Sequence, residues 1–144
     1  MTDKQAASKD WLNRNEPLRE EIRAMELRIE EMRDQVNKTT QIPKEISVQT
    51  QPKNAAAERI AEICDFEKKI AATREQFLLC QKTTTSTIER LNDPIKSRIL
   101  IYRYIYRRSW RYIAGKMHYK EGYIYELHLK ALTALFPFID WSAE

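Results

Sequence analysis

The stretch that decides the fold lies at residues 109–132, which read SWRYIAGKMHYKEGYIYELHLKAL. Ser109 is a residue type that caps helices, and the apolar residues after it recur at helical spacing. These residues are Trp110, Ile113, Ala114 and Met117 in a first segment, then Ile124, Leu127, Ala131, Leu132 and Leu135 in a second. The spacing predicts a short helix over 110–117, a turn at His118 and Tyr119, and a last helix from about Lys120 to Leu135.

A third helix is predicted just before this stretch. Asn92 or Asp93 is well placed to cap it, and Pro94 suits its first position, where a backbone amide hydrogen has no partner. Its apolar face is formed by Ile95, Ile99, Tyr102, Ile105 and Tyr106, and it is expected to end near Arg107. Three short helices with a tight turn between the last two form a helix-turn-helix, which we expect over residues 92–136.

The sequence from 92 to 135 resembles the region 4 helix-turn-helix of bacterial sigma factors. The Ile113–Ala114 pair, the apolar positions that follow and the closing Lys130-Ala131-Leu132 fall at matching spacing. The layout of the whole chain is similar to a family of phage and prophage proteins grouped with the RinA and ArpU late-gene transcription regulators. This resemblance implies a protein that binds promoter DNA and activates phage genes.

Three residues depart from the sigma-type pattern. His118 stands where a turn glycine is usual, Lys120 stands at the usual Ser or Thr cap, and Gly122 is an extra glycine in the last helix. A non-glycine residue in a left-handed turn costs about 1 kcal/mol. The turn at His118 can therefore have a different geometry from the turn of sigma factor region 4. The base preference of the family is not carried over.

Basic charge is concentrated in the C-terminal third of the chain. The formal net charge is +4, but residues 1–93 hold 16 Lys and Arg against 17 Asp and Glu, whereas residues 94–144 hold nine against four. Between Pro94 and Lys120 there are eight basic residues and no acidic residue. A block of one sign favours a polyanionic partner, although a solvated helical face would also produce it.

Roles on DNA follow from the way this motif docks, with the second helix in the major groove and the preceding helix across the backbone. The residues expected to read bases are Glu121, Gly122, Tyr123, Tyr125, Glu126 and Lys130. The residues expected to contact phosphates, and so to give affinity without sequence information, are Arg107, Arg108, Arg111, Lys116 and Lys120. Double-stranded DNA is therefore the expected partner.

The first part of the chain, residues 1–91, is predicted to be a coiled-coil helical hairpin. Apolar residues spaced alternately by four and three mark a heptad seam: Leu18, Ile22, Met25, Ile29, Met32 and Val36. One helix is expected over about 6–38, with Pro17 either kinking it or setting its start, and a second over 55–91 after a loop at 39–54. Pairing within the chain and pairing between copies in a homodimer or higher oligomer are both open.

The fold class expected for the whole chain is all-α: the hairpin, then the helix-turn-helix, then an apolar tail at 137–144. The tail begins beside Phe136 and contains Pro137, Phe138, Ile139 and Trp141. It either caps the last domain or forms a dimer contact.

Other classes of function are not indicated. Cys64 and Cys80 have no ligand-spaced partners, and His118 and His128 are too far apart for a metal site, so we expect no metal and no cofactor. No nucleophile stands near a base, so the chain is not expected to be an enzyme. The absence of a long apolar stretch and of a signal peptide predicts a cytoplasmic protein with no membrane partner.

Two further functions remain open. The acidic residues of the last helix would suit a coiled-coil adaptor that docks on RNA polymerase or another regulator without reading bases. Basic helices also bind structured RNA, as an antiterminator does. The salt dependence of DNA binding and discrimination between duplexes separate these alternatives from a sequence-reading regulator.

Overall fold

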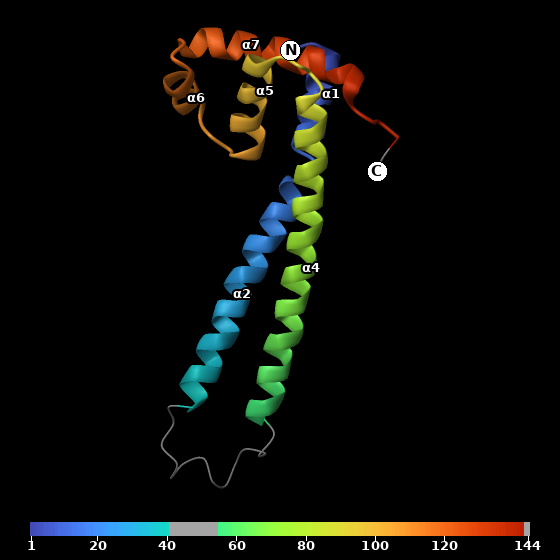
Figure 1. Ribbon diagram of the computed structural model, residues 1–144. Helices are drawn as coiled ribbons and strands as arrows, with labels where there is room; N and C mark the ends of the chain where they lie inside the picture. Colours follow the sequence, from blue (N-terminus) through green and yellow to red (C-terminus); the bar gives the residue numbers. More distant parts are fainter. Residues whose placement is uncertain (41–54, 143–144) are drawn as a thin grey trace. The chain divides into compact units, whose positions relative to one another are not determined.

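The computed structural model describes residues 1–40 and 55–142, and every secondary-structure element in those ranges is helical (Figure 1). The predicted all-α class is confirmed. The elements are α1 (Asp3–Leu12), α2 (Glu16–Thr40), α4 (Ala55–Glu89), α5 (Pro94–Leu100), the π-helix η1 (Ile101–Ile105), α6 (Trp110–Met117), α7 (Glu121–Leu135) and the 3₁₀-helix η2 (Phe136–Phe138). Apart from its first two residues, which belong to α2, the predicted loop at 39–54 lies outside the described residues.

The chain forms two compact units, and their boundaries differ from the expected division at residue 91. Unit 1 contains Met1–Glu16 and Leu78–Glu144, and unit 2 contains Pro17–Phe77. The N-terminal residues, expected in the hairpin, therefore belong to the same unit as the C-terminal helices.

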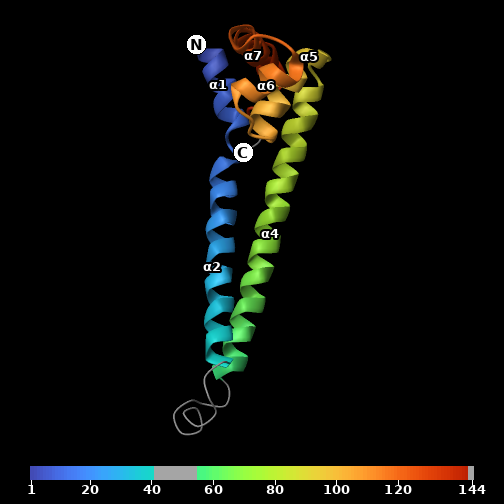
Figure 2. The same ribbon diagram turned by 90° about the vertical axis from the view of Figure 1, so that its left-hand side faces the viewer.

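Unit 2 is an antiparallel pair of helices formed by α2 and the first part of α4, which lie side by side in both views (Figures 1 and 2). Ile29 of α2 is buried with Ile63 and Ile70 of α4, and Met25, Met32 and Val36 of α2 are partly buried against them. Two ion pairs set the antiparallel register, Arg33–Glu67 at 2.7 Å and Arg74–Glu26 at 2.5 Å. The side chains of these ion pairs are about half exposed, so the pairs add little to the free energy of unfolding. Their main effect is to fix which residues of α2 and α4 lie opposite each other.

Pro17 determines where the second helix starts. α1 ends at Leu12, Asn13 is its C-cap, and α2 begins at Glu16 with Pro17 as its second residue. Inside a continuous helix, Pro17 would remove one hydrogen bond and its ring would collide with the carbonyl of Asn13. The single helix expected from about residue 6 to 38 is therefore two helices.

α1 packs on α7 through polar and apolar contacts. Ser8 is fully buried, and its hydroxyl donates to the Leu132 carbonyl at 2.9 Å. The Gln5 amide donates to the Leu129 carbonyl and to the Thr133 hydroxyl, both at 3.1 Å. These contacts hold α1 against α7 within unit 1.

The core of unit 1 has two apolar clusters. Ile99, Ile113, Ala114 and Ile124 join α5, α6 and α7 in one of them. The other is built from α1, α4, α5, η1, α7 and the tail, with buried residues Leu12, Ile88, Leu100, Tyr104, Ala131, Leu132, Leu135 and Ile139. Since Ile139 is only 5% exposed, the apolar tail contributes to the core of its own unit.

Asp93 caps α5, and its removal tests how much the cap stabilises unit 1. Its side chain accepts from the Lys96 amide at 3.2 Å, and Pro94 occupies the first helical position. We expect Asp93→Ala to lower the free energy of unfolding by about 1 kcal/mol, because the amide loses its acceptor. Urea denaturation followed by tryptophan fluorescence measures it, and Asp93→Asn, which keeps an acceptor, should lose much less. Equal losses in both variants would refute the capping role.

Candidate nucleic-acid interface

The connection between α6 and α7 is a tight turn with one left-handed residue. The Ser109 hydroxyl caps α6 by accepting from the Tyr112 amide at 3.1 Å. At the other end of α6, His118 has φ 61° and ψ 39°, and the amides of His118 and Tyr119 both donate to the Ala114 carbonyl. His118 therefore adopts the conformation that a turn glycine usually supplies, at a cost of about 1 kcal/mol.

α7 has one buried side and one exposed side. Ile124, Ala131, Leu132 and Leu135 are completely buried, and Leu127 is partly buried against the same core. The six residues predicted to read bases are all exposed: Glu121, Gly122, Tyr123, Tyr125, Glu126 and Lys130. We call these six residues the exposed face of α7. No other part of the described chain lies within 4 Å of a side chain placed at Gly122, so this glycine is not required for packing.

Two tyrosines of the exposed face are supported by other rings. The ring of Tyr123 lies 5.2 Å from that of Tyr119, in an edge-to-face arrangement. The ring of Tyr125 lies 5.4 Å from that of Trp110, also edge-to-face. Although both tyrosines are more than 40% exposed, these contacts restrict their rotation. A ligand that met them would therefore lose less side-chain entropy on binding.

Four of the five predicted phosphate contacts are exposed cations at or beside α6. Arg108 and Arg111 lie near its start, Lys116 in its last turn and Lys120 just before α7. Arg108 and Lys116 both approach the ring of Tyr112, at 5.1 and 5.9 Å from its centroid. These cations leave a positive surface beside the exposed face of α7.

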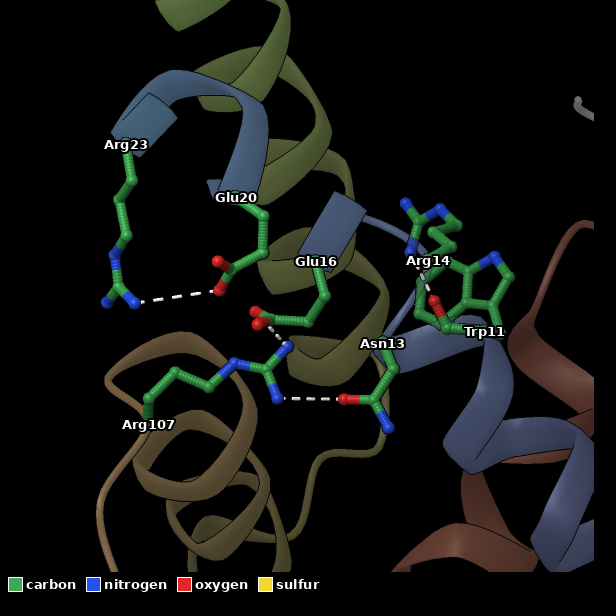
Figure 3. Close-up of polar contacts among 7 residues, drawn as sticks. All are labelled: Trp11, Asn13, Arg14, Glu16, Glu20, Arg23 and Arg107. Carbon is green, nitrogen blue, oxygen red and sulfur yellow. Dashed lines mark hydrogen bonds and ion pairs between the residues drawn. The ribbon is translucent and has the colours of Figure 1, made fainter. Parts of the chain in front are cut away.

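Arg107 differs from the other four cations because it contacts the N-terminal segment (Figure 3). Its Nη1 donates to Asn13 Oδ1 at 2.8 Å, and its Nη2 lies 2.5 Å from Glu16 Oε1. About 29% of its side chain is exposed, and its backbone is left-handed, with φ 55°. Arg107 therefore ties α1 and the start of α2 to the loop before α6.

A buried tyrosine–histidine pair lies behind the exposed face of α7. Tyr104 of η1 and His128 of α7 are 5% and 1% exposed, and Tyr104 Oη lies 2.6 Å from His128 Nε2. The ring of Trp110 packs on His128 at 4.5 Å. Burial raises the pKa of Tyr104, while burial and then the charge of Arg103 lower the pKa of His128 to about 4. Both groups are therefore neutral at pH 7, and their hydrogen bond joins α7 to η1.

Sequence reasoning excluded His128 as a metal ligand and did not find this pair. The position of His128 on α7 carried a signal, because it lies four residues after Ile124 and four before Leu132, on the buried side. Tyr104 could not be found in this way. The π-helix over Ile101–Ile105, closed by the Tyr106 amide donating to the Ile101 carbonyl at 3.0 Å, shifts the helical spacing there.

Lys120 occupies the cap position of α7 without capping it, which allows a test by gain of stability. Its backbone is extended, with φ −73° and ψ 148°, but its side chain accepts no backbone hydrogen bond. We expect Lys120→Ser to raise the free energy of unfolding by about 0.5–1 kcal/mol by supplying an acceptor, and Lys120→Ala to give no such gain. Urea denaturation measures both. A gain in the alanine variant as well would assign the effect to lost charge and contradict the capping explanation.

Comparisons with known proteins give no family or structural relative: no protein-family model, curated protein or solved structure matches the chain. Within residues 1–40 and 55–142, no group of three or more His, Cys, Asp or Glu is arranged to hold a metal ion. No helix in the described part of the chain is both long and apolar enough to span a membrane.

Proposed function

We propose that the protein is a sequence-specific DNA-binding transcription regulator in which α6 and α7 form a helix-turn-helix. The observation that carries the proposal is the exposed face of α7, which presents two tyrosines, two carboxylates and a lysine to solvent beside exposed cations around α6. A helix that presents hydrogen-bonding side chains next to a positive surface suits the major groove and its flanking phosphates.

Individual roles follow from the chemistry of base edges. Tyr123, Glu126 and Lys130 lie on the exposed side at spacings of three and four residues, so they share one stripe of α7. Glu126 can accept from cytosine N4 and Lys130 can donate to guanine, while Tyr123 can contact a thymine methyl or a phosphate. The phosphates would be bound by Arg107, Arg108, Arg111, Lys116 and Lys120.

The regulatory role is taken from the resemblance to sigma factor region 4 and to the RinA and ArpU phage regulators. On that basis the regulated genes are late phage or prophage genes, and the regulator activates them in a bacterial cytoplasm. We also propose that the protein acts as a homodimer or higher oligomer, since one helix-turn-helix with two glutamates on its reading helix gives weak affinity by itself.

A second candidate function is an adaptor that docks on RNA polymerase or another regulator without reading DNA. The observation that favours it is the acidic pair on the exposed face of α7, Glu121 and Glu126, which would be repelled by phosphates. RNA binding as an antiterminator is a further alternative, supported only by the basic surface.

The test is a titration of the full chain with duplexes from its own gene neighbourhood and with random duplex, at two salt concentrations. Changing Tyr123 and Glu126 together to Ala is expected to abolish the preference for the best duplex while keeping nonspecific binding, because the phosphate contacts remain. The matched control changes the exposed Tyr106 and Glu89 to Ala and should keep the preference. Loss of preference in both double variants, or no preference in the unchanged protein, would contradict the proposal.

A further inference from the structure

Unit 1 contains a small pocket whose lining includes no residue of the exposed face of α7. It has a volume of about 220 Å³ and is lined by Lys9 and Asn13 from the N-terminal segment, Arg103 and Tyr104 from η1, and Arg107 from the loop before α6. Three of its five lining residues are cations, and none is acidic.

The charges around the pocket do not cancel. Arg107 is paired with Glu16, so its charge is offset by one carboxylate. Within residues 1–40 and 55–142, neither Lys9 nor Arg103 forms an ion pair with a carboxylate. Two positive charges therefore remain in excess.

The side chains of the pocket are largely fixed before any ligand arrives. Arg103 Nη1 donates to the Arg108 carbonyl at 3.0 Å, and its guanidinium carbon lies 4.5 Å from the centroid of the Trp110 ring. Arg107 is held by Asn13 and Glu16. Of the two excess cations, Lys9 is exposed and Arg103 is partly buried. A pocket with fixed cations loses little conformational entropy when it binds an anion.

The buried side chain of His128 is affected by the same positive charges. His128 is hydrogen-bonded to Tyr104, which lines the pocket. After burial, the charges of Arg103 and Lys9 are what lower the pKa of this histidine. The positive charges of both cations therefore reach the buried side chains behind the pocket.

We propose that this pocket binds a phosphate group, with Lys9 and Arg103 supplying the charge and Asn13 and Arg107 forming its wall. Charge-assisted hydrogen bonds from lysine and arginine to phosphate oxygens are among the strongest in proteins. The volume admits a phosphate group with part of the molecule that carries it. The phosphate belongs either to a small free anion or to a nucleic-acid backbone, and the inference does not depend on base reading by α7.

The test uses the full chain labelled with nitrogen-15 and titrated with inorganic phosphate, against sodium chloride of equal ionic strength. We expect phosphate to shift the indole signal of Trp110 and the side-chain amide signal of Asn13. Lys9→Met should weaken phosphate binding about tenfold, which corresponds to one lost charge-assisted contact. The matched control is Lys82→Met, an exposed lysine of the same unit outside the pocket, and it should leave the affinity unchanged.

Binding measurements with duplex DNA distinguish the two sources of phosphate. If phosphate competes with duplex and Lys9→Met also weakens duplex binding, the ligand is a backbone phosphate. If phosphate binds and duplex binding is unaffected by Lys9→Met, the ligand is a free anion. The proposal is overturned if phosphate shifts neither signal, or if Lys9→Met and Lys82→Met bind phosphate equally.

Discussion

Changing Leu12 to Ala is expected to lower the free energy of unfolding of unit 1 by about 2–4 kcal/mol. Leu12 is 3% exposed, and it belongs to the cluster that contains Leu100, Leu132 and Leu135, so its removal leaves a cavity in that core. Urea denaturation followed by tryptophan fluorescence reports on unit 1 alone, because Trp11, Trp110 and Trp141 all lie in it.

The matched control is Leu79→Ala in α4, an exposed leucine of the same unit, with a side chain that is 59% exposed. It should change stability by less than about 1 kcal/mol, since little apolar surface is lost from the interior. Similar small effects at Leu12 and Leu79 would show that α1 is not part of the core. The same packing implies that an isolated fragment of residues 92–136, which lacks Leu12, Ile88 and Ile139, will not fold stably.

The second large effect is a loss of stability in mild acid caused by His128. Its pKa in the folded protein is about 4, whereas an unfolded histidine has a pKa of about 6.5. The unfolded chain therefore binds a proton first, so the stabilisation is complete above about pH 6.5 and is lost as the pH falls toward 4. The whole contribution is about 3 kcal/mol, of which about 2 kcal/mol is lost between about pH 7.5 and about pH 5.

Urea denaturation at the two pH values measures this loss. His128→Gln will lower the free energy of unfolding at both pH values, because the hydrogen bond to Tyr104 changes. The difference between the free energies at the two pH values should shrink by about 2 kcal/mol. His118→Gln, which replaces the exposed histidine, should keep the difference found in the unchanged protein. If His128→Gln shows the same pH dependence as the unchanged protein, His128 is not the group that titrates.

Short-range sequence patterns predicted the C-terminal helices well. The all-α class, the start of α5 at Pro94 and the bounds of α6 follow from caps and from apolar residues at helical spacing. These features depend on residues within one or two turns of each other, which a single sequence displays directly. The exposure of the six residues on α7 has the same origin, since burial of Ile124 and Leu132 leaves the opposite side in solvent.

Contacts between distant segments could not be predicted in this way. Ser8 and Leu12 meet α7 across more than a hundred residues, and no periodic pattern marks such a partner. The heptad seam that starts at Leu18 also favoured one continuous N-terminal helix, and the residues before Pro17 were therefore predicted to belong to the hairpin. Pro17 instead separates α1 from α2. Arg107 looked like one of several cations, and only the fold brings Asn13 and Glu16 to it.

The most direct test of sequence-specific DNA binding is the ratio of two dissociation constants, measured with the full chain at physiological salt. One is for random duplex and the other is for the best duplex of equal length from the protein's own gene neighbourhood. A sequence-reading regulator should bind the chosen duplex at least about a thousandfold more tightly. A ratio near one would contradict base reading by α7 and would make RNA polymerase the partner to test next.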